Sequence, residues 1–363
     1  MSKNQENKNI SISSLIVFII FLIFYLSNYQ NFTETNLSIL KIFNYIPLKI
    51  NLFFTHIILP TLIFILLQKI FLKYIPFLWA TSISTLSIVS YAGYDFKQFL
   101  FDLFFNSKNI NFFTEKKILL LENTNISIFV LFFLFLTLIC LKVNRFKPTQ
   151  IFGITILWSL FSFYSLSGSI IGIVFWNIYS SIRVLRLKKS FLITISMSLA
   201  NLIFFIIFIF SFKNIISIEG YPAVNIYNFT LNYFLFYFLG PIISIFVIYF
   251  FYKIDIYEIV IKFLPIYVLM FADLIVSIYL SNNAENYQNF EYFIYPHFIL
   301  HFLYIVPILY YLTRPPSPFI ENKKNTINTL KKYIFIFFNN ISKVYLSIMI
   351  LFLILFLFLP GKI

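Results

Sequence analysis

Two of the three histidines in the chain stand four residues apart in the segment EYFIYPHFILHFLYI, residues 291–305. The rest of the segment is mainly Phe, Tyr, Ile and Leu, as in an apolar helix. A spacing of four places His297 and His301 on one face of such a helix. Imidazoles can relay protons or bind a metal. Which chemistry is possible depends on the elements that surround them.

The composition is typical of a helical membrane protein. Hydrophobic residues make up 60% of the chain and charged residues 11%. Apolar runs such as SIMILFLILFLFL (347–359) recur along it, and about 20 apolar residues cross roughly 30 Å of hydrocarbon. We therefore expect an all-α, polytopic protein with a single integral membrane domain over residues 1–363, multi-pass in a bacterial inner membrane. The lipid bilayer is its expected partner.

The basic residues set the expected orientation. The net charge is +14, but Lys and Arg cluster between apolar runs, where they fix topology, so we expect no nucleic-acid partner. Apolar runs and basic clusters predict about eleven transmembrane or re-entrant segments with a cytoplasmic N-terminus. They are placed at 13–28, 50–69, 73–92, 125–141, 151–166, 169–182, 190–212, 229–252, 262–280, 290–312 and 342–359. Pro60 and Gly240-Pro241 predict helix kinks. The first run lacks a small-residue cleavage site, so we expect a retained span.

Basic clusters on both sides of residues 151–182 constrain that stretch. If both clusters are cytoplasmic, the stretch crosses the membrane an even number of times. It therefore forms a hairpin of two short helices, with its turn at 165–169 around Gly168. Helices of about 14–16 residues fall short of a full span and need protein or a water-filled cavity over their ends.

Asp273 is the predicted partner of the histidines. At about 1.5 Å per residue, an inward-running helix 290–312 places His297 about 10 Å and His301 about 16 Å below the external face. Asp273, on helix 262–280, shares the depth of His301. Consecutive antiparallel helices are usually neighbours, and an acid in hydrocarbon needs a partner. We expect a buried Asp273–His301 pair, either a proton relay or a packing hydrogen bond.

A metal site is the other chemistry open to these imidazoles. The third histidine, His56, is expected at the depth of His297, and HxxxH is a spacing that metal-binding helices use. No HExxH motif or nearby acid supplies a third ligand, and the single cysteine, Cys140, lies inside an apolar run. The sequence therefore predicts no metal and specifies no cofactor.

The segment EYFIYP, residues 291–296, also resembles the Arg-Tyr-Phe-Ile-Leu-Pro segment of dolichyl-phosphate-glucose-dependent glucosyltransferases. It is similar to the looser Arg-Tyr-Leu-x-Pro segment of other GT-C glycosyltransferases. Those multi-span enzymes take a sugar from a polyprenyl phosphate at the non-cytoplasmic face. Glu291 stands where the family has Arg, and the first external loop, 29–49, holds one acid where the family has a pair.

The resemblance implies an external acid that acts as a base and a cation that binds the lipid phosphate. The candidate catalytic acids are Glu34, Asp95 and Asp102. The candidate phosphate-binding cations are Lys41, Lys49 and Lys97. Tyr292 and His297, in and beside the motif, are further candidates for substrate binding. A polyprenyl-phosphate-linked sugar is the implied partner.

Two other functions fit the same sequence. A proton-coupled small-molecule transporter would use Asp273 and His301 near the midplane, where transporter sites lie. The odd number of spans and the lack of inverted repeats weigh against it. A non-catalytic membrane assembly protein would need none of these residues. We favour the glycosyltransferase-like enzyme and keep both alternatives.

Overall fold

The structure is a computed structural model of the chain. It describes residues 3–28, 52–91, 124–143, 147–161, 166–186, 199, 201–203, 206, 240–272, 303, 305–314 and 326–358. In these ranges the elements are helices and no strand occurs, which confirms the all-α class for this part of the chain. The segment count, the cytoplasmic N-terminus and the single domain stay predictions.

The chain divides into two compact units, described separately below. The terminal unit comprises Met1–Leu131 and Leu312–Ile363, and the central unit comprises Phe132–Tyr311. Three helical segments are long and apolar enough to cross a membrane, and all belong to the terminal unit: Asn9–Ser27, Phe54–Phe71 and Leu330–Leu351.

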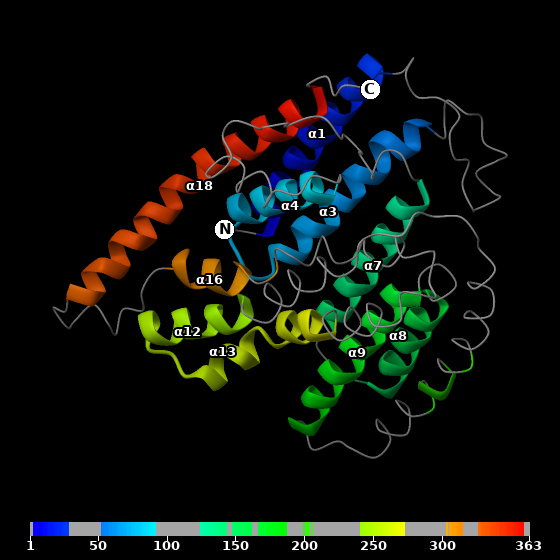
Figure 1. The fold of residues 1–363 in the computed structure, drawn as a ribbon, viewed down its shortest axis with the longest axis vertical. Coiled ribbons are helices and arrows are strands. Elements are labelled where there is room, and N and C mark those ends of the chain that lie inside the picture. Colours follow the sequence, from blue (N-terminus) through cyan, green and yellow to red (C-terminus); the bar gives the residue numbers. More distant parts are fainter. Residues whose placement is uncertain are drawn as a thin grey trace, which may run out of the picture. The chain divides into compact units, whose positions relative to one another are not determined.

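The terminal unit is a helical bundle. Its elements are α1 (Lys3–Asn28), the π-helical turn η3 (Phe54–Ile58), α3 (Leu59–Phe71), α4 (Phe77–Tyr91) and α18 (Thr326–Phe358). Helix α4 packs against both α3 and α18, and α1 packs against η3 and α3 (Figure 1). The side chains of Ile57, Phe64 and Phe71 are buried in its core.

Two prolines mark irregularities in this bundle. Pro60 lies in the first turn of α3, directly after η3. Proline has no N–H to donate, so the helical hydrogen-bond pattern changes near the predicted kink site. Pro76 ends the turn that joins α3 to α4, which is why α4 begins at Phe77 and not at residue 73 as predicted.

Helix α18 is longer than the span predicted at 342–359. Its 33 residues extend over about 50 Å, against roughly 30 Å for the hydrocarbon core of a bilayer. Lys331 and Lys332 precede the span that the sequence predicts at 342–359. The structure places both inside α18, so this helix begins before the predicted start of the span.

The central unit contains the larger part of α7 (Thr124–Lys142), then α8 (Pro148–Phe161), α9 (Leu166–Arg186), α12 (Gly240–Tyr252), α13 (Ile256–Lys262) and α16 (Ile305–Leu312). Residues 264–272 are also helical. Helix α8 packs on α9, and α12 packs on α13 (Figure 1). The span predicted at 125–141 agrees with α7 to within one residue at each end.

The predicted hairpin over 151–182 is present as the two helices α8 and α9. The predicted position of its turn is wrong, because α9 begins at Leu166 and Gly168 lies in its first helical turn. The hydroxyl of Ser169 donates to the carbonyl oxygen of Trp158 and ties the start of α9 to α8. Helix α9 has 21 residues, so only α8, with 14, is as short as expected.

Candidate functional site

A buried group of polar side chains joins three helices of the terminal unit. Gln68, on α3, is fully buried, and its Nε2 donates to Ser13 Oγ on α1 at 2.9 Å and to Thr81 Oγ1 on α4 at 2.7 Å. The Thr81 hydroxyl in turn donates to the carbonyl oxygen of Phe77 at 2.8 Å. We call Ser13, Gln68 and Thr81 the Gln68 cluster.

The Gln68 cluster fixes the register of these helices. A buried amide without partners is costly in an apolar environment, so Gln68 stabilises the arrangement in which both of its N–H bonds are used. This arrangement brings the first half of α1, the end of α3 and the beginning of α4 together. Lys69 and Lys73 are exposed at the same end of α3 and in the turn that follows it.

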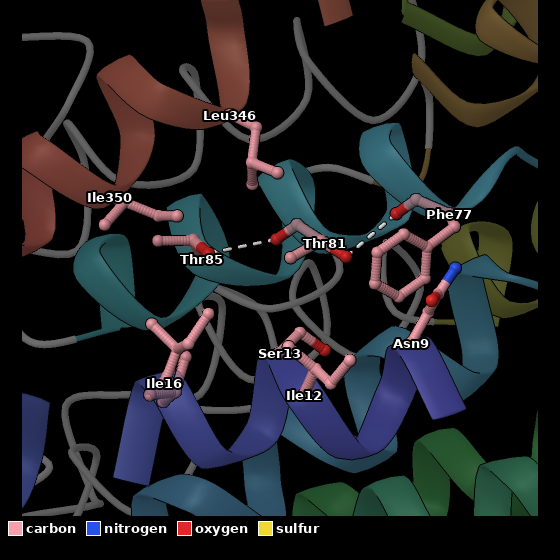
Figure 2. Close-up of a pocket in the computed structure, with 10 residues that line it drawn as sticks. Asn9, Ile12, Ser13, Ile16, Phe77, Thr81, Thr85, Leu346 and Ile350 are labelled. Carbon is pink, nitrogen blue, oxygen red and sulfur yellow. Dashed lines mark hydrogen bonds between the residues drawn. The ribbon is translucent and has the colours of Figure 1, made fainter. Parts of the chain in front are cut away.

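A pocket of about 140 Å³ lies beside the cluster, between α1, α4 and α18 (Figure 2). Its apolar lining consists of Ile12, Ile16, Val17, Phe77, Leu346 and Ile350. Its polar lining consists of Asn9, Ser13, Thr81 and Thr85. No charged side chain lines it.

The hydroxyl groups in this pocket have their protons directed into the helix. The Thr85 hydroxyl donates to the carbonyl oxygen of Thr81 at 3.0 Å, as the Thr81 hydroxyl does to that of Phe77 (Figure 2). These two hydroxyl groups can therefore accept hydrogen bonds from a ligand but have no proton left to donate to it. A sugar, which needs several donors and acceptors, therefore fits the pocket poorly, whereas an apolar chain fits it well.

The central unit has a contrasting contact between α8 and α9, centred on Trp158. Trp158 is fully buried, and its indole N–H donates to Cys140 Sγ on α7 at 3.4 Å. A Cβ placed on Gly172 of α9 would lie 2.1 Å from the Trp158 ring, so only glycine permits this approach. We call Cys140, Trp158 and Gly172 the Trp158 junction. Cys140 serves there as a packed acceptor.

An amide pair links α9 to the helical residues 201–203. Asn177 Nδ2 donates to Asn201 Oδ1 at 2.9 Å, and Asn201 Nδ2 donates to Asn177 Oδ1 at 3.1 Å. Each carboxamide thus satisfies the other. Such reciprocal amide bonds hold helices together where water is excluded.

The residues predicted to form the site lie outside the described residues, and their roles stay predictions. These are Glu34, Asp95, Asp102, Lys41, Lys49, Lys97, Tyr292, His297, Asp273 and His301. His56 is described. It is buried in η3, with its ring centroid 6.2 Å from that of Tyr25 on α1. Within the described ranges, no group of three His, Cys, Asp or Glu side chains could hold a metal ion.

Sequence reasoning missed the Gln68 cluster, although a signal for it was present. Gln68 follows Thr61 by seven residues, which places the two polar side chains on one face of an apolar helix. In α4, TSISTLS (81–87) holds five hydroxyl residues, and all five are buried. Small polar residues are typical of helix contacts in membranes.

No family model, curated protein or solved structure matches this chain. Its class therefore follows from its helices. The described part is all-helical, and three of its helical segments are long and apolar enough to span a membrane. These properties are compatible with an integral membrane protein.

Proposed function

We propose that this protein is a multi-pass membrane glycosyltransferase that transfers a sugar from a polyprenyl phosphate at the non-cytoplasmic face. The observation that carries the proposal is the EYFIYP segment at 291–296, with its resemblance to GT-C enzymes. The apolar helices of the terminal unit and the short helix α8 support it, because that family combines many spans with some short helices.

The chemistry assigns distinct roles to the predicted residues. A carboxylate, Glu34 in the first place and otherwise Asp95 or Asp102, takes the proton of the acceptor hydroxyl as its oxygen attacks the anomeric carbon. The bond from that carbon to the phosphate oxygen breaks, and the polyprenyl phosphate departs with the added negative charge. A lysine among Lys41, Lys49 and Lys97 stabilises this charge.

Lipid analysis of a deletion strain tests the proposal. Without the enzyme, the polyprenyl-phosphate sugar should accumulate, and the wild-type gene should return it to its normal level. Glu34→Gln should fail to do so at normal expression, because an amide cannot accept the proton. Glu258→Gln is the matched control, since Glu258 is an exposed acid on α13, far along the chain from Glu34. An unchanged lipid profile in the deletion strain would exclude this activity.

Proton-coupled transport is the second candidate, favoured by the equal predicted depth of Asp273 and His301. Asp273→Asn separates the two functions. A transporter should lose its pH-dependent flux, whereas a glycosyltransferase should keep its activity and lose about a kcal/mol of stability or less. If Glu34→Gln and Asp273→Asn both leave function intact, the third alternative, an assembly protein, is favoured.

A further inference from the structure

The pocket beside the Gln68 cluster has two different ends. Asn9 and Phe77 lie at one end and Ile16, Thr85 and Ile350 at the other (Figure 2). Its walls include Ile16 of the candidate span Asn9–Ser27 and Ile350 of the candidate span Leu330–Leu351. The end at Ile16 and Ile350, the inner end, therefore lies between two candidate spans, and the end at Asn9 and Phe77, the outer end, lies near the beginning of both α1 and α4.

The pocket is open towards the surroundings of the bundle. Ile12 and Ile16, two of the α1 residues that line it, remain 49% and 42% exposed. On a membrane-spanning helix such side chains face the hydrocarbon of the bilayer. A flexible apolar chain can therefore reach the pocket sideways from the membrane.

Two exposed basic residues lie close in sequence to Phe77, at the outer end of the pocket. Lys69 is exposed near the end of α3, and Lys73 is exposed in the turn that leads to Phe77 at the beginning of α4. Basic residues beside a span mark the cytoplasmic side and attract anionic lipid headgroups. Charge and apolar lining together fit one kind of molecule, which has an anionic head and a hydrocarbon tail.

We propose that this pocket binds an acyl chain of an anionic glycerophospholipid from the cytoplasmic leaflet, with the lipid phosphate at the Lys69–Lys73 end. The volume of about 140 Å³ accommodates part of one chain, since a similar apolar cavity of about 150 Å³ takes up benzene. This site is separate from the lipid-linked sugar of the proposed function, which is expected at the opposite face. The bound phospholipid would stabilise the packing of α1 against α4 and α18.

Thermal unfolding of the full-length protein in detergent tests the site. The probes are phosphatidylglycerol and phosphatidylcholine with the same acyl chains. Phosphatidylglycerol should raise the melting temperature in a saturable way, and at lower concentration than phosphatidylcholine. Lys69→Gln or Lys73→Gln should each weaken the response to phosphatidylglycerol about fivefold and leave that to phosphatidylcholine unchanged.

Variants that fill the pocket separate specific from general lipid effects. Ile350→Trp should abolish the shift, whereas Ile348→Trp, at a 51% exposed position of α18 outside the pocket, should keep it. If Ile350→Trp fails to fold, Ile16→Phe on the α1 wall, with Ile19→Phe as its control, makes the same comparison. The proposal would be overturned if a pocket variant and its control gave equal shifts of the melting temperature. It would also be overturned if the two lipids gave equal shifts. A polyprenyl phosphate that matches phosphatidylglycerol would overturn it as well, because the pocket would then belong to the lipid-linked substrate.

Discussion

In the terminal unit, α1, α3 and α4 are joined by hydrogen bonds of the Gln68 cluster, whereas in the central unit α8 and α9 are joined by the fit of the Trp158 ring against Gly172. Hydroxyl and amide groups can change partners when one of them is removed. A rigid ring against a bare Cα position cannot adjust in this way. We therefore expect the Trp158 junction to tolerate substitution less than the Gln68 cluster, even though Gln68 is fully buried.

The largest effect is expected at Gly172. Gly172→Ala places a methyl group 2.1 Å from the Trp158 ring, and overpacking of this kind costs about 3 kcal/mol. The yield of folded protein and the free energy of unfolding should both fall. Gly153→Ala in α8 is the matched control, because nothing lies within 4 Å of its added Cβ, and it should be neutral or stabilise by up to about 1 kcal/mol. Similar free energies of unfolding for the two variants would show that α8 and α9 do not pack as in this structure.

A smaller loss is expected for Gln68→Leu, which removes the two hydrogen bonds that the Gln68 amide donates and the one that it accepts from Ser13 Oγ. The hydroxyls left behind have alternatives, since Ser13 Oγ also lies 3.0 Å from the carbonyl oxygen of Ile10, and Thr81 donates to that of Phe77. We expect about 1 kcal/mol, as for other hydrogen bonds between membrane helices. Equilibrium unfolding in mixed detergent micelles measures it. A loss of stability greater than that of Gly172→Ala would mean that the Gln68 cluster tolerates substitution less than the Trp158 junction, contrary to our expectation.

The smallest effect is expected for the Asn177–Asn201 pair, where two half-buried amides bind each other. A double-mutant cycle with Asn177→Ala and Asn201→Ala should give a coupling energy of about 0.6 kcal/mol. Strict additivity of the two substitutions would mean that the amides do not interact.

The sequence predicts helix positions well where apolar runs have polar ends. Helix α7 illustrates this, because Lys142 and the polar, basic segment up to Pro148 determine where it ends. The prediction was poorer where a helix continues past its apolar run. Lys331 and Lys332 lie inside α18 and inside its candidate span Leu330–Leu351, because a helix can continue through charged residues that interrupt an apolar run.

The contacts between helices were harder to predict than the helices. Gln68 and Thr81 are 13 positions apart, and Ser13 and Gln68 are 55 apart. Their meeting depends on the turn at Pro76 and on the antiparallel packing of α1, which no local pattern specifies. The Trp158–Gly172 contact likewise requires the observed offset between α8 and α9. A turn placed at Gly168 does not give this offset, so the contact was not predicted.

Cysteine labelling with a membrane-impermeant maleimide tests most directly the claim that this is a multi-pass membrane protein of the predicted orientation. Wild type supplies the unlabelled baseline, because its single cysteine, Cys140, is fully buried. We expect Ser167→Cys, in the first turn of α9, to react from the external side of cells whose inner membrane is intact. Lys73→Cys and Lys147→Cys should react only after that membrane is opened. Labelling of Lys73→Cys in intact cells, or labelling of Ser167→Cys and Lys147→Cys from the same side, would contradict the account.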